Sequence, residues 1–317
     1  MKINIFTSDG KNWFTNRTKV YPDVELYENV DDPSIVWDIV AVYENLTKTI
    51  SCKANNYLYI CGEPPYMDYY PKKFLSQFDK VLTANNTIKH PNMVQWQQAL
   101  PFHVGKSAIK RCYSLDFKQL SNIVKPKDTK PISLIASNLS KLPGHKKRLS
   151  IVKQLERSGY PIDFFGRGRN FVDDKLDAIN PYLFHICIEN TSIPDYWTEK
   201  LSDSIACLSV PIYVGCTNIE DYFDSRSMFV ANSYDDLTHI LDSILVNPEA
   251  VYNDKLPFLK VERDKLFEKF NIVESIKHCN LNSKTVKAKT LCPRETFFMY
   301  EWKRKFLVLL LRLSLLQ

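Results

Sequence analysis

Residues 189–200 carry the side chains with the clearest chemical potential in this sequence. The ammonium group of Lys200, together with free backbone N–H groups at the start of a helix, could neutralise a diphosphate. The carboxylate of Glu199 could instead accept hydrogen bonds from neighbouring hydroxyl groups of a sugar. Asn190 and Tyr196 add an amide and a phenol close by in the chain. The alternative for Glu199 and Lys200 is an exposed ion pair that holds no ligand.

Arg148 is a second cation that could contact an anion. Within residues 144–158, apolar side chains at positions 149, 151, 152 and 155 define one face of a predicted helix. A rotation of about 100° per residue places Arg148 near the middle of that face. An inward arginine needs an acidic side chain or a ligand phosphate, and its fork of donors suits phosphate. The alternatives are a structural ion pair or a buried aliphatic stem beneath an exposed charge.

Glu63 is the candidate for proton transfer. It follows an apolar strand pattern directly, in a loop that Pro64 and Pro65 stiffen. A carboxylate at the end of a strand could act as the general base that activates a hydroxyl group. The alternative is a solvated loop glutamate. His103 and Tyr66 could line a site for the second substrate, although structural roles are the more ordinary ones.

A βαβ unit must position most of these residues. Residues 182–188 predict a buried strand, a helix is expected to begin at Asp195 as its N-cap, and residues 211–215 predict a second strand. Four apolar residues at helical spacing are expected to face the core: Trp197, Leu201, Ile205 and Leu208. Ligands of open α/β sheets bind at the carboxyl ends of the strands, which is where the polar residues of this segment fall.

The chain of 317 residues is long enough for two domains. We expect an N-terminal α/β domain over residues 1–125, with a polar linker within residues 121–131. A C-terminal α/β domain over residues 131–280 and a basic amphipathic tail over residues 290–317 follow. The expected strands lie at 2–6, 35–43, 57–61, 78–83, 131–137 and 161–165, and helices are expected over much of 234–277.

The composition is that of an ordinary soluble globular protein, with 44% hydrophobic and 25% charged residues. Eight cysteines without a CxxC pair predict free thiols in a reducing compartment and argue against a zinc site. No signal-peptide pattern is visible at the N-terminus. The net charge of +6 is mild. Because the basic residues are scattered or gathered in the tail, we expect no nucleic-acid partner.

The tail over residues 297–317 contains the basic run 303–305 followed by an apolar run. The apolar run is too short for a bilayer span of about 20 residues. It predicts either an interfacial helix on anionic lipid or a helix packed on protein.

Three segments together carry a resemblance to a known family: IDFFGRG at 162–168, YLFHICIEN at 182–190 and DYWTEKLSDSIACLSVPIYVG at 195–215. They resemble the family 10 glycosyltransferases, the α-1,3/4-fucosyltransferases. Trp197 stands where valine is usual, and Ile188 where phenylalanine is usual. The likeness is best over residues 131–235 and weaker over the first domain, where YICGEPP and FDKVLTANN are similar to the acceptor half of the family.

The resemblance implies an α/β fold of GT-B architecture, in which two Rossmann-like domains face a cleft. It implies GDP-fucose as donor, a glycan acceptor, inversion at the anomeric carbon, and no required cofactor or metal, although a divalent metal could stimulate the reaction. By position, Glu63 corresponds to the general base of the family. The implied donor-binding residues are Arg148 and Lys200 on the diphosphate, with Asn190, Tyr196 and Glu199.

The resemblance also implies a bacterial enzyme of the cytoplasm, either free or peripheral on the inner face of the membrane through residues 297–317. The expected acceptor is GlcNAc or Glc of a surface oligosaccharide such as lipopolysaccharide, in α-1,3 linkage. Two alternatives stay open. The chain could transfer another sugar from a nucleotide, or it could bind a nucleotide sugar without catalysis.

Overall fold

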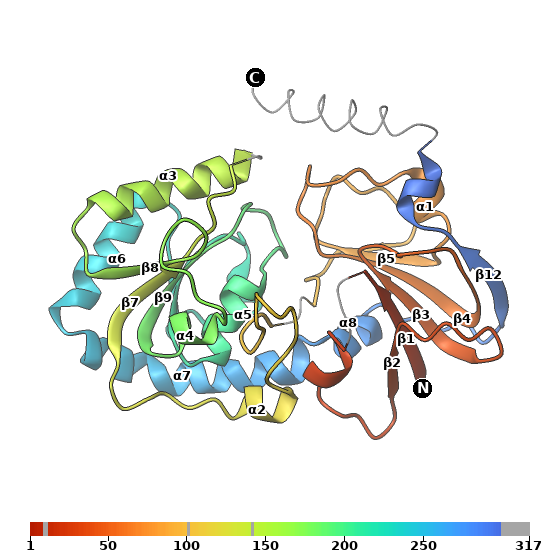
Figure 1. Ribbon diagram of the computed structural model, residues 1–317, viewed down its shortest axis with the longest axis horizontal. Coiled ribbons are helices and arrows are strands. Elements are labelled where there is room, and N and C mark those ends of the chain that lie inside the picture. Colours follow the sequence, from red (N-terminus) through yellow and green to blue (C-terminus); the bar gives the residue numbers. More distant parts are fainter. Residues whose placement is uncertain (9–11, 100–101, 141–142, 299–317) are drawn as a thin grey trace. The chain divides into compact units, whose positions relative to one another are not determined.

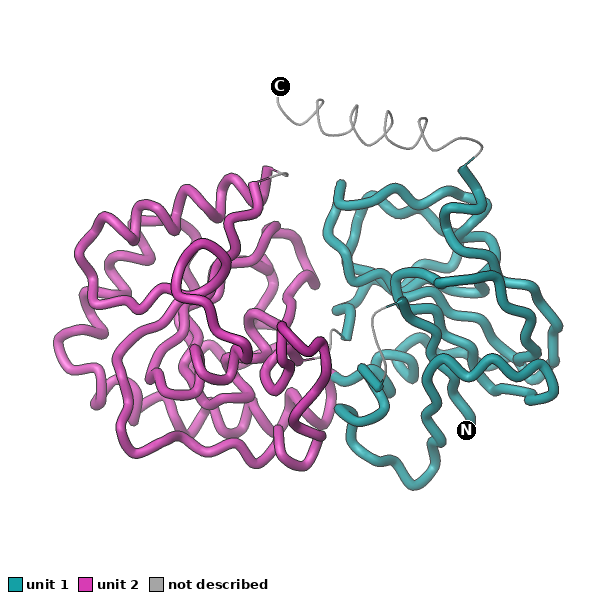
Figure 2. The backbone as a smooth tube through the Cα atoms, in the orientation of Figure 1, with its two compact units in different colours: residues 1–99, 271–317 teal, residues 100–270 magenta. Residues whose placement is uncertain are grey.

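The computed structural model describes residues 1–8, 12–99, 102–140 and 143–298. It divides into two compact units, shown in different colours in Figure 2. Unit 1 comprises Met1–Ala99 and Asn271–Gln317, and unit 2 comprises Leu100–Phe270.

Unit 1 is built on a seven-stranded sheet with the strand order β2-β1-β3-β4-β5-β6 and with β12 paired to β4. Among the strand pairs of the described residues in unit 1, β12–β4 is antiparallel and the others are parallel. Figure 1 shows β12, near the end of the chain, beside β4. The strand bounds are β1 Lys2–Thr7, β2 Glu25–Glu28, β3 Val36–Tyr43, β4 Ile50–Cys61, β5 Lys80–Thr83, β6 Met93–Val94 and β12 Lys287–Leu291. The helices are η1 Thr15–Arg17, α1 Lys72–Leu75, α8 Ile272–His278 and η4 Arg294–Phe297.

Unit 2 is built on a parallel five-stranded sheet with the order β11-β10-β9-β7-β8. Its strands are β7 Lys130–Ile135, β8 Ile162–Phe165, β9 Tyr182–Ile188, β10 Val210–Val214 and β11 Phe229–Val230. Helices cover the sheet (Figure 1). They are α2 Phe117–Ser121, α3 Pro143–Arg157, α4 Leu176–Ile179, α5 Glu199–Ala206, α6 Tyr234–Val246 and α7 Pro248–Lys269, with the short turns η2 Ile219–Asp221 and η3 Ser225–Ser227.

The central strands of both sheets are buried on both faces, which explains their unbroken apolar sequences. Every residue of β9 is buried, as is the second half of β4. The predicted strands at 2–6, 35–43, 57–61, 78–83, 131–137, 161–165, 182–188 and 211–215 are confirmed, with ends that shift by a few residues and an earlier start for β4.

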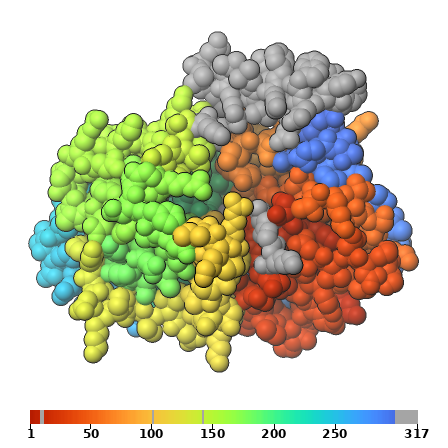
Figure 3. All heavy atoms as spheres, in the orientation of Figure 1, coloured from red at the N-terminus to blue at the C-terminus, as the bar shows by residue number. Residues whose placement is uncertain are grey.

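The division into units differs from the predicted boundaries at 125, 131 and 280. Residues 100–125 group with unit 2, because their backbone is bonded to that unit; for example, the Ala108 N–H donates to the Asp173 carbonyl at 2.8 Å. The space-filling view shows this yellow segment against the green part of unit 2 (Figure 3). Asp173 also accepts from the Ser107 hydroxyl.

The predicted tail over 290–317 begins inside unit 1. Its first residues complete β12 and form η4, where the Arg294 guanidinium lies 2.6 Å from the Asp68 carboxylate and Phe297 packs against the core. The remainder, 299–317, lies outside the described residues, so the lipid-binding prediction stays a prediction. Within the described part of the chain, no helix combines the length and apolar character needed to cross a membrane.

The predicted N-cap at Asp195 is wrong. Helix α5 begins at Glu199, and Thr198 is its N-cap, with a side chain that accepts from the Lys200 N–H. Asp195 has a positive φ of 63°. Its carboxylate accepts hydrogen bonds from Tyr222 at 2.7 Å and Asn218 at 3.0 Å, and these contacts hold it in the preceding loop.

Candidate functional site

The sheet of unit 2 contains a topological switch point between β7 and β9. From β7 the chain crosses to β8 on one side, and it then returns to β9, β10 and β11 on the other side. Ligands of open parallel sheets bind outside the carboxyl ends of the strands at such a point. Ser137 follows β7 and Asn190 follows β9, so both lie at this edge.

Arg148, on α3, spans the switch point. Its guanidinium donates to the Asn190 Oδ1 at 2.6 Å and to the Ser137 Oγ at 3.0 Å. The residue is 6% exposed, and its Nε has no hydrogen-bond partner in the described structure. No ion pair within 4.0 Å is found for it among the described residues. Burial lowers the pKa of its guanidinium, and the nearby Glu189 and Glu199 act in the opposite direction. A buried cation held by neutral oxygens keeps its capacity for an anion.

The start of α3 approaches the end of β9 closely. A Cβ atom built on Gly144 would lie 1.6 Å from the Asn190 carbonyl oxygen. Only glycine fits at this position, which lets the first turn of α3 reach the switch point. The predicted inward direction of Arg148 is confirmed by its burial.

Lys200, in the first turn of α5, lies between two carboxylates. Its Nζ is 3.3 Å from Glu189 Oε2, 3.5 Å from Glu199 Oε1 and 2.9 Å from the Thr198 hydroxyl. The Lys200 side chain is 20% exposed. Burial opposes the charge of this ammonium group, but Glu189 and Glu199 together raise its pKa. Lys200 is therefore protonated at neutral pH, and the carboxylates of Glu189 and Glu199 already balance its charge.

Glu189 anchors the start of α5 from the end of β9. Its fully buried carboxylate accepts from the Thr198 N–H at 2.8 Å and from the Thr198 hydroxyl at 2.8 and 2.9 Å. Burial raises the pKa of Glu189, and Lys200 acts in the opposite direction. These contacts fix the orientation of the first turn of the helix.

Glu199 is the partner of a second lysine. Its Oε1 lies 3.3 Å from Lys175 Nζ and 3.7 Å from His103 Nδ1, and its side chain is 14% exposed. Burial would raise the pKa of Glu199, but Lys200 and Lys175 lower it well below its usual value. Burial, and then Lys175, lower the pKa of His103 to about 3, so His103 is neutral at pH 7 and its contact with Glu199 is not an ion pair.

Asp203 extends this network by one helical turn. It lies 3.6 Å from Lys175 Nζ and accepts from the backbone N–H groups of His103 and Val104. Burial raises the pKa of Asp203 to about 6. Three carboxylates (Glu189, Glu199 and Asp203) and three cations (Arg148, Lys175 and Lys200) thus occupy the carboxyl edge of unit 2.

Of the predicted donor-binding residues, the structure brings together Arg148 with Asn190, and Glu199 with Lys200. Tyr196 is 3% exposed in the loop before α5, and its role stays a prediction. The next residue, Trp197, packs edge-on against Phe223 and Phe270, which accommodates a ring where the family pattern has valine.

Sequence reasoning missed Lys175 and Asp203 and misplaced His103. The four-residue spacing of Glu199 and Asp203 on one helix was a usable signal, because side chains four apart share a face. Lys175 precedes Glu199 by 24 residues and gave no local signal. His103 was predicted in the first domain near the acceptor, whereas it belongs to unit 2 and lies beside Glu199.

Glu63 lies in unit 1, directly beyond the carboxyl end of β4. It is partly buried, and its backbone N–H donates to Glu44 Oε1 at 2.9 Å. Glu44, which follows the neighbouring strand β3, was not singled out from the sequence. Burial, and then the nearby Glu63, raise the pKa of Glu44 to about 8. Tyr66, three residues after Glu63, has a positive φ of 67° and is 36% exposed.

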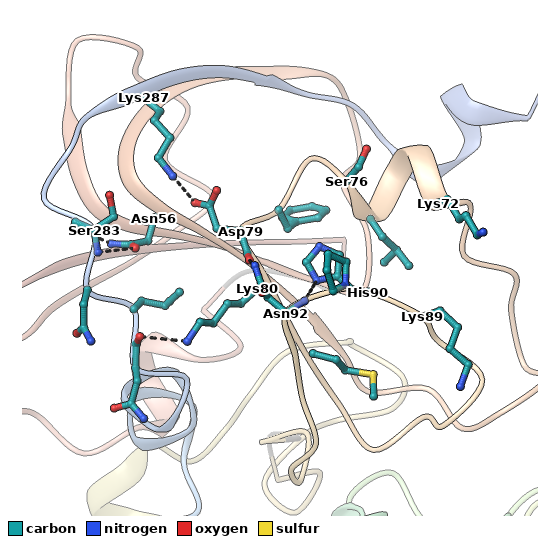
Figure 4. Close-up of a pocket in the computed structure, with 17 residues that line it drawn as sticks. Asn56, Lys72, Ser76, Asp79, Lys80, Lys89, His90, Asn92, Ser283 and Lys287 are labelled. Carbon is teal, nitrogen blue, oxygen red and sulfur yellow. Dashed lines mark hydrogen bonds and ion pairs between the residues drawn. The ribbon is translucent and has the colours of Figure 1, made fainter.

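A cavity of about 880 Å³ lies elsewhere in unit 1, at the amino end of β5 (Figure 4). Four lysines line it: Lys72, Lys80, Lys89 and Lys287. Lys80 donates to the Cys279 carbonyl at 2.5 Å, and Lys287 is paired with Asp79 at 2.9 Å. The cavity shares no residue with the predicted site. Glu63, at the carboxyl end of the parallel strand β4, lies at the opposite edge of the sheet.

Within the described chain, no group of three His, Cys, Asp or Glu side chains is arranged to hold a metal ion. The absence of a cofactor stays a prediction. All eight cysteines are free thiols.

The fold is that of a known class of transferases. A crystal structure of an α1,3-fucosyltransferase with GDP-fucose superposes with a TM-score of 0.52 at 18% identity, over 90% of this chain and 91% of that one. A second, with GDP, gives a TM-score of 0.51 at 17% identity, over 90% and 91% of the two chains. The predicted two-domain α/β fold of GT-B type is thereby confirmed.

A model of the C-terminal domain of glycosyltransferase family 10 (fucosyltransferase) matches residues 125–290, slightly more than half of the chain. The chain therefore belongs to glycosyltransferase family 10, which confirms the resemblance drawn from residues 162–215.

Curated relatives match over shorter segments. A fucosyltransferase-like protein of Arabidopsis thaliana is 31% identical over 140 residues, which are 42% of this chain and 27% of the relative. An α-(1,3)-fucosyltransferase of Helicobacter pylori is 29% identical over 73 residues, or 23% of this chain and 15% of the relative. An α-(1,4)-fucosyltransferase of Arabidopsis thaliana is 37% identical over 57 residues, or 18% and 14%. The match thus spans about a quarter or less of these relatives.

Proposed function

We propose that this chain is an inverting fucosyltransferase that moves L-fucose from GDP-fucose to a hydroxyl group of a glycan. Membership of family 10 supports the reaction class. The observation that carries the donor assignment is the buried Arg148, which joins the ends of β7 and β9 at the switch point. Among the described residues, its guanidinium is hydrogen-bonded to neutral oxygens of Asn190 and Ser137. A diphosphate at this edge would supply an anion hydrogen-bonded directly to the guanidinium.

The donor site uses the start of α5 as well as Arg148. The positive end of the α5 dipole and the Lys200 ammonium stabilise negative charge that develops on the leaving GDP. Asn190 and Tyr196 contact the donor, and Glu199 accepts hydrogen bonds from fucose hydroxyls. Since Lys200 is already paired with Glu189, a bound diphosphate competes with that carboxylate for the ammonium group.

Glu63 acts as the general base. Its carboxylate takes the proton of the acceptor hydroxyl while the hydroxyl oxygen attacks the anomeric carbon of fucose. The bond from that carbon to the diphosphate oxygen breaks, and GDP leaves with the electron pair. Attack from the face opposite the leaving group inverts the anomeric configuration. The reaction needs no metal, because Arg148, Lys200 and the dipole of α5 carry the stabilisation.

The acceptor is a surface oligosaccharide, with transfer in α-1,3 linkage to GlcNAc or Glc. Among the relatives, the H. pylori α-(1,3)-fucosyltransferase supports this linkage. Because the A. thaliana relative is an α-(1,4)-fucosyltransferase, the experiment must also determine the linkage of the product. Under this proposal the reaction takes place in the cytoplasm. The basic run 303–305 supports contact of residues 297–317 with an anionic inner membrane face.

The test is an incubation of the purified chain with several nucleotide sugars and a glycan panel, with mass detection of the product. We expect transfer from GDP-fucose. The Glu63→Gln variant should bind GDP normally in calorimetry and lose transfer by about 10²-fold or more. The exposed Glu25→Gln variant is the matched control in unit 1. Two results would overturn the proposal: transfer of a sugar other than fucose, or binding of GDP-fucose without transfer to any acceptor in the panel.

A further inference from the structure

The two-residue backbone of Gly62 and Glu63 is held by side chains from three other segments of unit 1. Glu44 Oε1 accepts from the Gly62 N–H and, at 2.9 Å, from the Glu63 N–H. Asn85 Nδ2 donates to the Glu63 carbonyl at 3.3 Å, and Gln98 Nε2 donates to the Gly62 carbonyl at 3.4 Å. Both N–H groups and both carbonyls of this dipeptide are therefore bonded to side chains.

The three side chains come from the carboxyl ends of different strands. Glu44 follows β3 and has a positive φ of 62°, Asn85 follows β5, and Gln98 follows β6. Asn85 and Gln98 are each 1% exposed. Asn85 is itself held, because its N–H donates to the Thr83 hydroxyl at 2.9 Å. Backbone groups in loops usually bond to water, so a buried cage around a single turn is a specific arrangement.

Glycine is required at position 62 by the same arrangement. A Cβ there would lie 2.6 Å from the Tyr43 hydroxyl and 3.2 Å from Glu44 Oε1. The turn therefore lies directly against the end of β3. With a larger residue at position 62, either the Tyr43 side chain or the turn that carries Glu63 would have to move.

The cage puts one carboxyl group beside another, which is unfavourable for stability. Burial and Glu63 favour the protonated form of Glu44, and Arg294 acts in the opposite direction. The other titratable groups around Glu44 are Cys61, Tyr59 and Tyr70. Both N–H donors use Oε1, whereas Oε2 lies 3.5 Å from the Tyr70 hydroxyl, so Oε2 can carry a proton while the contacts to the turn persist. The feature that Glu44 supplies to the turn is thus an acceptor oxygen and not a negative charge.

We propose that Glu44, supported by Asn85 and Gln98, is a positioning residue that fixes the turn carrying Glu63 in the orientation needed for proton transfer. This inference rests on the proposed role of Glu63 as general base. The energetic reason is that a general base acts only within hydrogen-bond reach of its proton, and a shift of about 1 Å can cost about 10²-fold in rate.

The test compares Glu44→Ala with Glu44→Gln in the transfer assay. Glu44→Ala removes the acceptor and should lower kcat by about 10- to 100-fold, with the KM values and the GDP affinity within about 3-fold of wild type. Glu44→Gln keeps an acceptor oxygen and should restore kcat to within about 3-fold of wild type. Asn85→Ala and Gln98→Ala should each lower kcat as well. If Glu44→Ala does not fold, these two variants test the positioning role in its place.

Asp79→Ala is the matched structural control. Asp79 accepts from the Tyr57 N–H at 2.9 Å at the amino edge of the same sheet, so its loss should lower stability and leave kcat unchanged. If wild type transfers fucose, Glu63→Gln does not, and the folded Glu44→Ala, Asn85→Ala and Gln98→Ala variants keep normal kcat, the positioning role is refuted and the function stands. If wild type transfers nothing, the proposed function itself fails.

Discussion

Replacing Lys200 with methionine removes an ammonium group from between two carboxylates and keeps an unbranched side chain of similar length. Glu199 retains Lys175 at 3.3 Å, but Glu189 loses the one cation within 4.0 Å that the described residues provide. Glu189 is fully buried, so the change leaves a carboxylate whose remaining hydrogen-bond partner among the described residues is Thr198.

The size of the effect has an upper limit. Breaking a buried pair by removing one partner costs roughly 3–5 kcal/mol. Glu189 can avoid this by taking up a proton, which costs about 1.4 kcal/mol per pH unit above ~4.3 and so about 4 kcal/mol at pH 7. Since the Thr198 bonds remain, we expect the free energy of unfolding to fall by about 2–4 kcal/mol at pH 7.

The loss of stability in Lys200→Met should depend on pH in a definite direction. In the variant, burial without the Lys200 ammonium raises the pKa of folded Glu189 above that of the unfolded chain. A carboxyl with a raised folded pKa is destabilising where the unfolded chain is ionised, so the deficit is largest near pH 7 and shrinks as the pH falls toward ~4.3. Urea titrations of wild type and variant at pH 5 and pH 7 measure it. The exposed Lys147→Met variant is the control.

Calorimetry with GDP then separates the two roles of Lys200. We expect Lys200→Met to weaken GDP binding by about 10-fold or more, in line with a lost charge-assisted contact of roughly 1.5–3 kcal/mol. The double variant Glu189→Gln with Lys200→Met should recover stability and not GDP affinity. A loss of stability below about 0.5 kcal/mol, or one that does not change with pH, would refute the ion-pair reasoning.

Three further changes test other parts of the structure. Arg148→Lys keeps the charge but loses the fork of donors, and it should weaken GDP binding by about 10-fold in calorimetry; an unchanged affinity argues against the diphosphate role. Thr198→Val removes the N-cap of α5 and a partner of Glu189, and should lower the free energy of unfolding by about 1–3 kcal/mol in urea; no change would contradict the capping role. Deletion of residues 299–317 should move the protein from the membrane fraction to the soluble fraction after centrifugation, whereas unchanged partitioning would reject lipid binding.

The parallel strands could be predicted from the sequence because their burial on both faces leaves a direct mark. The bounds of β9 coincide with the predicted 182–188, and the second half of β4 was found for the same reason. The β12 sequence KAKTL carries no comparable mark, because it is a partly exposed strand whose partner lies far away in the chain. The start of α5 was misplaced, because aspartate is a residue type common at N-caps, whereas the Asp195 carboxylate accepts a hydrogen bond from Tyr222 instead of capping the helix.

Site residues could be predicted only where a short segment contains both the reactive side chain and the pattern that places it. Asn190, Glu199 and Lys200 lie close together in the chain, and Arg148 stood out on an apolar helical face. Contacts between distant segments left no local trace. Glu44 and Lys175 each meet their partners through the sheet topology, which the sequence pattern did not reveal in detail.

Unit 1 is not a continuous stretch of chain, since β12 completes it after all of unit 2 has been made. Until residues 287–291 emerge from the ribosome, the Ile50–Ala54 half of β4 presents an open edge on the side that β12 later occupies. Open edges recruit other strands and promote aggregation. A fragment limited to residues 1–99 would keep this liability, whereas joining 1–99 to 271–298 by a short linker would seal it.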